Sequence, residues 1–259
     1  MDMVVQETMM FDKVNGIILK QTDFRDASAI ITVLSEDHGK LSFVANGVRK
    51  PKSKLAGRLL PYTFNEFLID YKENKTMFSL KNISSINFYK HIHEDIYLST
   101  ACAVISEIAD SMVLNGLESE YAKEMYSFVK LSFDLLETKH DSKTILALFI
   151  IESMNLFGIT CDVDECVHCG NHSVSAISVS EGGFLCQECA EILNIRYSSK
   201  LDLKRFRLLV KGGLKHYEII ETTTIATNED IEILVEMVRA HAGIKIQSFA
   251  LFKRLNDLD

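Results

Sequence analysis

The sequence lacks any long apolar run and any recognisable leader. The longest uninterrupted apolar stretch in the 259 residues, Ile145 to Ile151, is far too short to cross a bilayer. The first residues include Asp2 and Glu7, without the basic start and long apolar stretch of a secretory signal. We therefore expect a cytoplasmic protein without a membrane segment.

Proline and linker-like sequence are also scarce. The only prolines are Pro51 and Pro61, and there is no internal repeat, low-complexity tract or long linker. A hydrophobic content of 47% can fill ordinary cores, so we expect a globular chain of one large domain or two to three small ones. A net charge of −8 argues against non-specific coating of nucleic acid, unless a local basic surface reverses it.

The signatures of common enzymes are missing. We find no GxxxxGK[ST] loop, no GxGxxG after a strand and no GxSxG elbow. A zinc deaminase needs proline before its Cys-x-x-Cys pair, but Glu165 and Leu185 stand at those positions. The one His-x-Glu, at 216–218, follows both cysteine pairs. We therefore expect no catalytic residues and no enzymatic activity.

Short strands are predicted at the start of the chain. Five segments are rich in β-branched and aromatic residues: 14–22, 27–34, 40–45, 62–71 and 77–87. Leu41, Phe43 and Ala45 alternate with polar Ser42 and Asn46, which predicts one buried and one wet face. The alternation slips within 62–71, which predicts a bulge in the fourth strand. A small, closed or nearly closed barrel fits this pattern best.

A helical period replaces the strand pattern after His91. Apolar spacing predicts helices at 96–108, 125–135, 142–157, 203–216 and 228–242. Residues 142–157 are apolar on nearly all sides, so this helix should be central, and Gly158 should end it. Asn228 to Asp230 should begin the last helix.

Six cysteines in a reducing compartment are poor evidence for disulfides. Four of them form two CxxC pairs, Cys166 with Cys169 and Cys186 with Cys189, sixteen residues apart, which is the spacing of a four-cysteine zinc ribbon. Four protein ligands leave no open position for water, so we expect one structural zinc ion. The glycines at 170, 182 and 183 would supply the ribbon's turns, between strands at 176–180 and 184–185.

Other interpretations of the cysteines and histidines stay open. The four cysteines could be buried free thiols, and His168 or His172 could replace one thiolate. Cys102 and Cys161 are more typical of core residues.

The predicted fold class is α+β. It has a five-stranded barrel of the oligonucleotide-binding (OB) type at 13–89, after an extension at 1–12. An all-helical domain follows at 90–259, interrupted by a zinc minidomain at 161–195.

A basic segment runs from Arg49 to Arg58, with five basic residues in ten and no acid. We place it in the loop between the third and fourth strands, where a positive patch can displace counterions from phosphates. The alternative is a solvated loop that keeps the chain soluble. The predicted DNA-binding residues are Lys20, Arg25, Arg49, Lys50, Lys52, Lys54 and Arg58.

Two further groups have more than one interpretation. Phe43, Tyr62 and Phe64 could stack on bases, although aromatic residues of a small barrel are more often core. A later basic cluster could contact DNA or an acidic partner, or form a solvated helix face. Its members are Lys204, Arg205, Arg207 and Lys211.

Several segments resemble the RecO family of bacterial recombination mediators. The most specific segment begins with Leu156-Phe157-Gly158 and continues through the first cysteine pair to Gly170. Others lie at 16–26, 47–50, 182–189 and 243–248. The resemblance implies binding of single- and double-stranded DNA and annealing of complementary strands. It also implies that the protein, with RecR, helps load RecA onto DNA covered by single-strand-binding protein (SSB). The SSB tail is a further implied partner, and association with the nucleoid is implied during repair. A rival hypothesis is a zinc-stabilised adaptor that makes only protein contacts.

Overall fold

The computed structural model describes residues 12–53, 55–71, 75, 77–114 and 120–257. The chain divides into two compact units, one formed by Met1–Tyr89 with Val113–Tyr126 and the other by Lys90–Met112 with Ser127–Asp259. Within the described ranges, no helix has the length and apolar character that crossing a membrane requires. The domain boundaries expected from the sequence stay a prediction.

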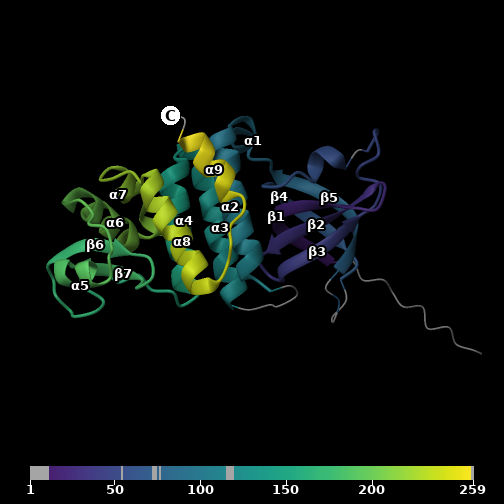
Figure 1. The fold of residues 1–259 in the computed structure, drawn as a ribbon. Coiled ribbons are helices and arrows are strands. Elements are labelled where there is room, and N and C mark those ends of the chain that lie inside the picture. The colour runs from purple at the N-terminus through teal and green to yellow at the C-terminus, as the bar shows by residue number, and fades with distance from the viewer. Residues whose placement is uncertain (1–11, 54, 72–74, 76, 115–119, 258–259) are drawn as a thin grey trace, which may run out of the picture. The chain divides into compact units, whose positions relative to one another are not determined.

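Five strands of the first unit close into a barrel, drawn in purple to blue in Figure 1. They are β1 (Asp12–Phe24), β2 (Ser28–Ser35), β3 (Gly39–Ala45), β4 (Phe64–Ile69) and β5 (Met77–Asn87). Their order is β1-β2-β3-β5-β4, and β4 pairs back with β1. The β3–β5 pairing is parallel and the other pairings are antiparallel. This closed five-stranded order confirms the predicted barrel of the OB type.

The interior of the barrel is filled from alternate positions of its strands. Leu41, Phe43 and Ala45 are buried as predicted, and the Phe43 ring lies 5.1 Å from the Phe67 ring between centroids. Phe43 is therefore a core residue. The prediction of a wet opposite face was wrong for Ser42, which is buried between its direct neighbours Thr32 on β2 and Met77 on β5.

The predicted bulge in the fourth strand was also wrong. The β4 strand alternates regularly, and its buried positions are Asn65, Phe67 and Ile69. Its pairing with β5 skips Lys81 and Ile86, so the extra residues belong to β5. The slip in the sequence arises because Phe64, at the start of β4, is half-buried on the face opposite to Phe67 and Ile69. Tyr62 precedes the strand in a left-handed conformation, with φ of 65°.

The second unit is built around α4 (Ser142–Leu156), which is buried along most of its length and packs against α2, α6 and α8. Its central position confirms the prediction from its all-round apolar sequence. The longer helices of the chain are α2 (Ile96–Met112), α3 (Glu120–Lys139), α6 (Lys200–Gly212) and α8 (Asn228–Ala242). Shorter elements are α1 (Lys90–Glu94), η2 (Leu214–His216), α7 (Tyr217–Glu221) and α9 (Phe249–Asn256).

The helix ends show where local sequence decided the structure. Gly158 follows α4 with φ of 74°, as predicted for a glycine that ends a helix. The α6 helix stops at Gly212, earlier than predicted, because Gly213 has φ of 74° and ψ of 159°, which no α-helix continues. The α8 helix is capped by Thr227 in a capping box with Asp230, so the cap lies one residue before the predicted Asn228.

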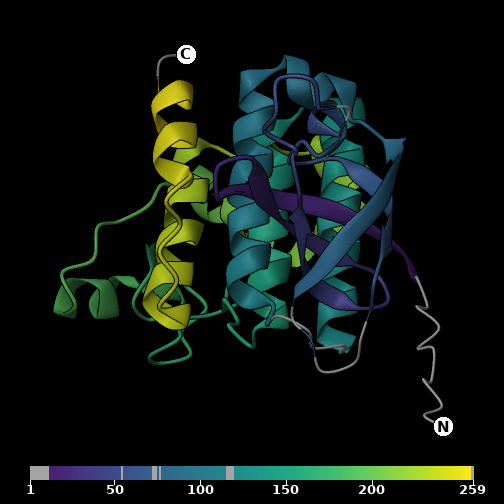
Figure 2. The same cartoon turned by 90° about the vertical axis from the view of Figure 1, so that its right-hand side faces the viewer.

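The α9 helix was not predicted. It packs against α2 and α8 and buries Phe252. It lies beside α8 in Figure 1, and the two helices overlap, in yellow tones, in the view of Figure 2. Its start is held by Glu107 of α2, whose carboxylate accepts the N–H groups of Gln247 and Ser248 at 2.9 and 2.7 Å. A side chain 140 residues earlier in the chain therefore caps this helix, and no local sequence pattern predicts the helix.

Candidate metal centre and basic barrel surface

The four paired cysteines lie in a small ribbon between α4 and α6. Strands β6 (Val174–Ser178) and β7 (Gly183–Cys186) form its hairpin, and α5 (Gln187–Ile192) follows. The first pair comes from the loop before β6, where Gly170 has φ of 71° and its N–H donates to the Cys166 carbonyl at 2.8 Å. A Cβ at Gly183 would meet the Asp162 carbonyl at 2.4 Å, so only glycine allows this approach.

The chain on either side of the hairpin adds to the same sheet. Asp162, in the incoming segment, bridges Gly183 of β7, and Tyr197, in the outgoing segment, bridges Ala176 of β6. The N–H of Phe184 donates to the Asp162 carbonyl at 2.9 Å. The ribbon is therefore hydrogen-bonded at both edges to the chain that connects it to the helices.

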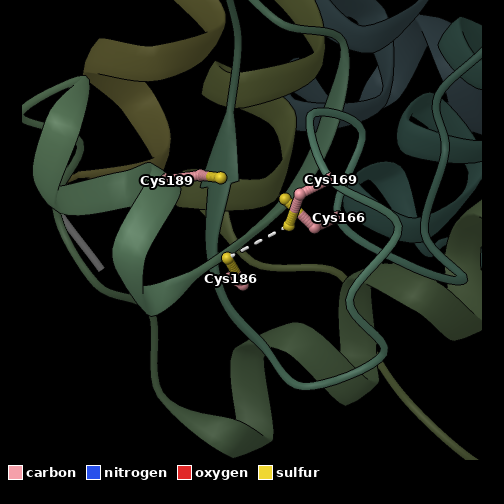
Figure 3. A group of neighbouring side chains, drawn as sticks. All are labelled: Cys166, Cys169, Cys186 and Cys189. Atoms are coloured by element: carbon pink, nitrogen blue, oxygen red, sulfur yellow. Dashed lines mark hydrogen bonds between the residues drawn. The ribbon is translucent and has the colours of Figure 1, made fainter.

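The four sulfur atoms converge, as Figure 3 shows, from the loop, the end of β7 and α5. All four Sγ atoms lie within 4.8 Å of one another, and those of Cys169 and Cys186 are 3.6 Å apart. A zinc ion with four thiolates at about 2.3 Å requires sulfur separations of about 3.8 Å. The predicted cysteine cluster is confirmed, and its geometry is suited to a four-coordinate metal.

Neither neighbouring histidine belongs to this cluster within the described part of the chain. His168 Nε2 lies 2.6 Å from the Glu181 carboxylate, and His172 Nδ1 lies 3.7 Å from the Glu165 carboxylate. Cys102 is fully buried on α2, and burial raises the pKa of its thiol well above the ordinary value. Burial also raises the pKa of Cys161 to about 12. Both remain outside the metal cluster. Cys102 is a core residue as predicted, whereas Cys161 is only half-buried.

The electrostatics of the cluster favour a cation. Burial opposes ionisation of the Cys166 thiol, but N–H donors of Cys186, Cys169 and His168 outweigh it and lower its pKa to about 6. Neighbouring thiols, Cys186 foremost, raise the pKa of Cys189 to about 12. Four thiolates this close repel one another, and a bound divalent cation would allow all four to ionise.

The basic segment of the barrel is anchored by buried residues near its two ends and is exposed between them. Val48 and Leu59 are buried in the barrel core, at the two ends of the loop between β3 and β4. Lys50 and Lys52 are exposed between them, and the short 3-10 helix η1 (Ala56–Arg58) precedes Leu59. Lys54, also predicted to bind DNA, lies outside the described residues.

The structure brings some of the predicted DNA-binding residues together. Arg25, in the turn between β1 and β2, lies beside Arg49, whose Nη1 donates to the Arg25 carbonyl at 3.4 Å. The Arg58 Nη1 approaches the Ile83 carbonyl at 3.5 Å, on β5. Lys20 is exposed on β1, directly opposite Thr32. Arg25 and the 49–58 segment therefore share one end of the barrel, and Lys20 lies farther along a strand.

The aromatic residues of the barrel divide between core and surface. Tyr62 and Phe64 are half-buried, unlike Phe43 in the core. Sequence reasoning missed Phe24, whose ring lies 4.9 Å from the Arg25 guanidinium. An aromatic residue next to an arginine in a predicted turn was the available signal for this pair.

Formal charge is segregated along the chain. Residues 13–89 hold twelve Lys and Arg against seven Asp and Glu, a net charge of +5 in a chain of −8. The ribbon segment 161–195 holds six Asp and Glu and no Lys or Arg. The barrel is therefore the basic part of an acidic protein, and the ribbon is a poor surface for phosphates.

The later basic cluster of α6 is largely engaged in ion pairs. Arg205 is 11% exposed, and its Nε lies 2.6 Å from the Asp230 carboxylate of α8. Arg207 and Lys211 both pair with Asp164 of the ribbon, at 2.7 and 2.5 Å, while Lys204 is exposed. These pairs join α6 to α8 and to the ribbon. The signal for Asp164 was the acidic run 162–165 just before the first cysteine pair.

A barrel of the oligonucleotide-binding type, followed by a helical unit with an inserted four-cysteine ribbon, defines a class of OB-fold proteins that carry a candidate metal-binding ribbon. Two family models match the chain: Recombination protein O N terminal over residues 9–89 and Recombination protein O C terminal over residues 93–248. The chain therefore belongs to the RecO family of DNA repair proteins.

Similar proteins carry the name DNA repair protein RecO. One from Bacillus pumilus (strain SAFR-032) is 30% identical over 183 residues, which covers 70% of this chain and 69% of the relative. One from Bacillus cytotoxicus is 31% identical over 189 residues, covering 70% and 72%. One from Caldanaerobacter subterraneus subsp. tengcongensis is 26% identical over 252 residues, covering 96% and 100%.

Proposed function

We propose that the protein is a non-enzymatic mediator of DNA repair and recombination in the bacterial cytoplasm, acting at the nucleoid. It binds single- and double-stranded DNA, anneals complementary strands, and with RecR helps load RecA onto DNA covered by SSB, whose tail it also binds. The observation that carries this proposal is the net charge of +5 on the barrel of a chain of −8. Membership of the RecO family supports it.

The proposed DNA surface is the end of the barrel that holds Arg25 and the 49–58 segment. Exposed lysine and arginine side chains release counterions when they neutralise phosphates, and this favours binding without reading base sequence. Neutralising the phosphates of two strands also reduces the repulsion that opposes their pairing. Annealing forms hydrogen bonds between bases but makes and breaks no covalent bond in the DNA, and therefore needs no catalytic group.

The ribbon cysteines would hold zinc in a structural role. Four thiolates complete a tetrahedral site without an open position for water or substrate. The acidic ribbon surface is unsuited to DNA, so the metal stabilises the fold of the second unit and does not contact phosphate.

Strand annealing with and without SSB tests the mediator function. We expect annealing of complementary oligonucleotides to proceed from bare strands and from SSB-coated strands, and to weaken as salt rises. Annealing of bare strands alone would leave a generic DNA binder. Affinity for oligonucleotides that does not change with salt would contradict phosphate contact.

A second candidate is the adaptor that makes only protein contacts. It is favoured by an apolar hollow of about 320 Å³ at α6 and α7, lined in part by Leu208, Ile219 and Ile220. Ile219 is 66% exposed there. Tight binding to RecR or to an SSB tail peptide, with no binding to any oligonucleotide, would favour the adaptor over the mediator.

A further inference from the structure

One arginine ties together the two segments at the basic end of the barrel. The Arg49 Nη2 atom lies 3.0 Å from the Asp23 carboxylate, at the end of β1. Its Nη1 donates to the Arg25 carbonyl at 3.4 Å, and its backbone N–H donates to the Ala27 carbonyl at 3.1 Å. A residue of the loop after β3 therefore binds the end of β1 and two residues of the turn between β1 and β2.

The surroundings of Arg49 fix it further. Ser28 Oγ donates to Asn46 Oδ1 at 3.2 Å, which joins the same two segments, and Val48 is buried beneath them. Lys50 and Lys52 differ from Arg49, because their side chains are exposed and form no ion pair with any residue that the structure describes. The two lysines are open to a ligand, whereas Arg49 is already paired.

Arg25 is preset by the same contacts. Its φ of 54° lies in the left-handed region that residues other than glycine seldom adopt. Arg49 holds its carbonyl, and the Phe24 ring lies 4.9 Å from its guanidinium carbon. The backbone is held from one side and the side chain from the other, so the guanidinium is presented at the surface in a restricted position.

We infer that Arg49 is a positioning residue of the DNA surface and not one of its phosphate contacts. Asp23 already neutralises Arg49, so Arg49 has little further counterion to release to DNA. Its role is to order the turn and the loop in advance, which lowers the cost of presenting Arg25, Lys50 and Lys52 to phosphates. The statement that Arg49 acts in DNA binding rests on the proposed function. The statement that Arg49 orders the turn and the loop rests on the contacts described above.

Salt dependence separates a positioning residue from a phosphate contact. Affinity of the full-length protein for fluorescein-labelled oligothymidine is measured by anisotropy over a salt series, for Arg49→Gln and its neighbour Lys50→Gln. Lys50→Gln should reduce the slope of log affinity against log salt by about 0.7, the value for one phosphate contact on a single strand. Arg49→Gln should keep the slope and weaken binding about twofold to fivefold at every salt concentration. An equal loss of slope in both variants would overturn the inference.

Variants of Asp23, the acidic partner of Arg49, give a second comparison, in which a negative charge is removed instead of a positive one. Asp23→Asn and Asp26→Asn each remove one negative charge, from the end of β1 and from the turn that follows it, but Asp26 forms no ion pair among the described residues. Asp26→Asn should strengthen binding, because less negative charge faces the phosphates. Asp23→Asn should bind about twofold to fivefold more weakly than Asp26→Asn, because it also removes the ion pair that orders the loop. Equal strengthening by both asparagine variants would overturn the inference.

Hydrogen exchange in the protein without DNA tests the loop contacts alone. Exchange of the amides of Arg49 and of Ser53, which donates to the Lys50 carbonyl at 2.9 Å, should be faster in Arg49→Gln and Asp23→Asn. It should be unchanged in Lys50→Gln and Asp26→Asn, and partly restored in Arg49→Lys, which keeps the ion pair. Unchanged exchange in Arg49→Gln overturns the inference whether or not DNA binds. Faster exchange in a protein that binds no oligonucleotide refutes the proposed function and leaves the positioning of the loops by Arg49 intact.

Discussion

Arg205 of α6 and Asp230 of α8 form a buried ion pair, with Nε and Oδ2 only 2.6 Å apart. Asp230 is 1% exposed, and it also closes the capping box with Thr227 at the start of α8. Asp202, one turn before Arg205 on α6, lies 2.7 Å from its Nη2. Arg205 therefore links the first turn of its own helix to the start of another. From the sequence it belonged to a basic cluster with three interpretations: a DNA contact, a contact to an acidic partner, or a solvated helix face.

Arg205→Ala should destabilise the protein by about 3–5 kcal/mol, because it leaves the buried Asp230 carboxylate without its cation. Urea unfolding followed by circular dichroism measures the change. Lys204→Ala, at the exposed neighbouring position of α6, is the matched control and should change stability by less than about 0.5 kcal/mol. Equal stability of the two variants would show that the pair contributes nothing.

The metal centre predicts a specific stoichiometry. Protein purified without chelator should contain one zinc ion per chain, and Cys166→Ser should lower that content and the thermal midpoint together. Elemental analysis and thermal unfolding provide the measurements. Cys161→Ser changes a nearby cysteine outside the cluster, so it should retain the metal. Full zinc content in Cys166→Ser would exclude the four-thiolate site.

Acid should weaken the start of α6. The Ser199 hydroxyl, followed by the Arg205 guanidinium, lowers the pKa of Asp202 from its ordinary value of 3.8. This stabilisation is complete above the ordinary pKa and is lost as pH falls through the lowered one. Asp202→Asn should thus reduce stability at neutral pH by less than about 1 kcal/mol, since the carboxylate is one-third exposed.

In strong acid, the free energy of unfolding of Asp202→Asn should become equal to that of the unmodified protein. Chemical unfolding at a series of pH values tests this convergence. Glu36→Gln alters an exposed carboxylate of the barrel, and its stability should follow that of the unmodified protein throughout. A constant difference at all pH values would mean that the ionised carboxylate of Asp202 has no stabilising role.

The central helix predicts a large packing effect at one phenylalanine and a small one at another. Phe149 is fully buried in α4, so Phe149→Ala should cost about 3–5 kcal/mol. Phe157, at the end of the same helix, is 41% exposed, and Phe157→Ala should cost far less. Denaturant midpoints compare the two. A similar loss in both would contradict the central placement of α4.

The features predictable from the sequence are those set by neighbouring residues. The spacing within each CxxC pair and the glycines at the turns define a ribbon locally, and the apolar residues of 142–157 define a central helix. The strands of the barrel follow from their β-branched and aromatic residues. These signals need no knowledge of distant contacts.

The features that could not be predicted depend on distant partners. The pairing of Arg205 with Asp230 spans 25 residues, and Glu107 caps α9 across 140. Ser42 is buried by neighbours on two other strands. The extra residues of the β4–β5 pairing lie on β5, although the sequence alternation slips within the predicted fourth strand. A basic residue therefore cannot be assigned to a surface until its acidic neighbours in space are known.

The bridges at both edges of the ribbon affect the behaviour of the protein when metal is removed. A two-stranded hairpin ordinarily exposes unpaired backbone groups that can recruit strands of other molecules. Here Asp162 covers the edge of β7 and Tyr197 covers the edge of β6, so neither edge is open along its whole length. Loosening the cysteine cluster would free the segments around Asp162 and Tyr197 from the two edges. Protein treated with a chelator should consequently be prone to aggregation as well as to unfolding.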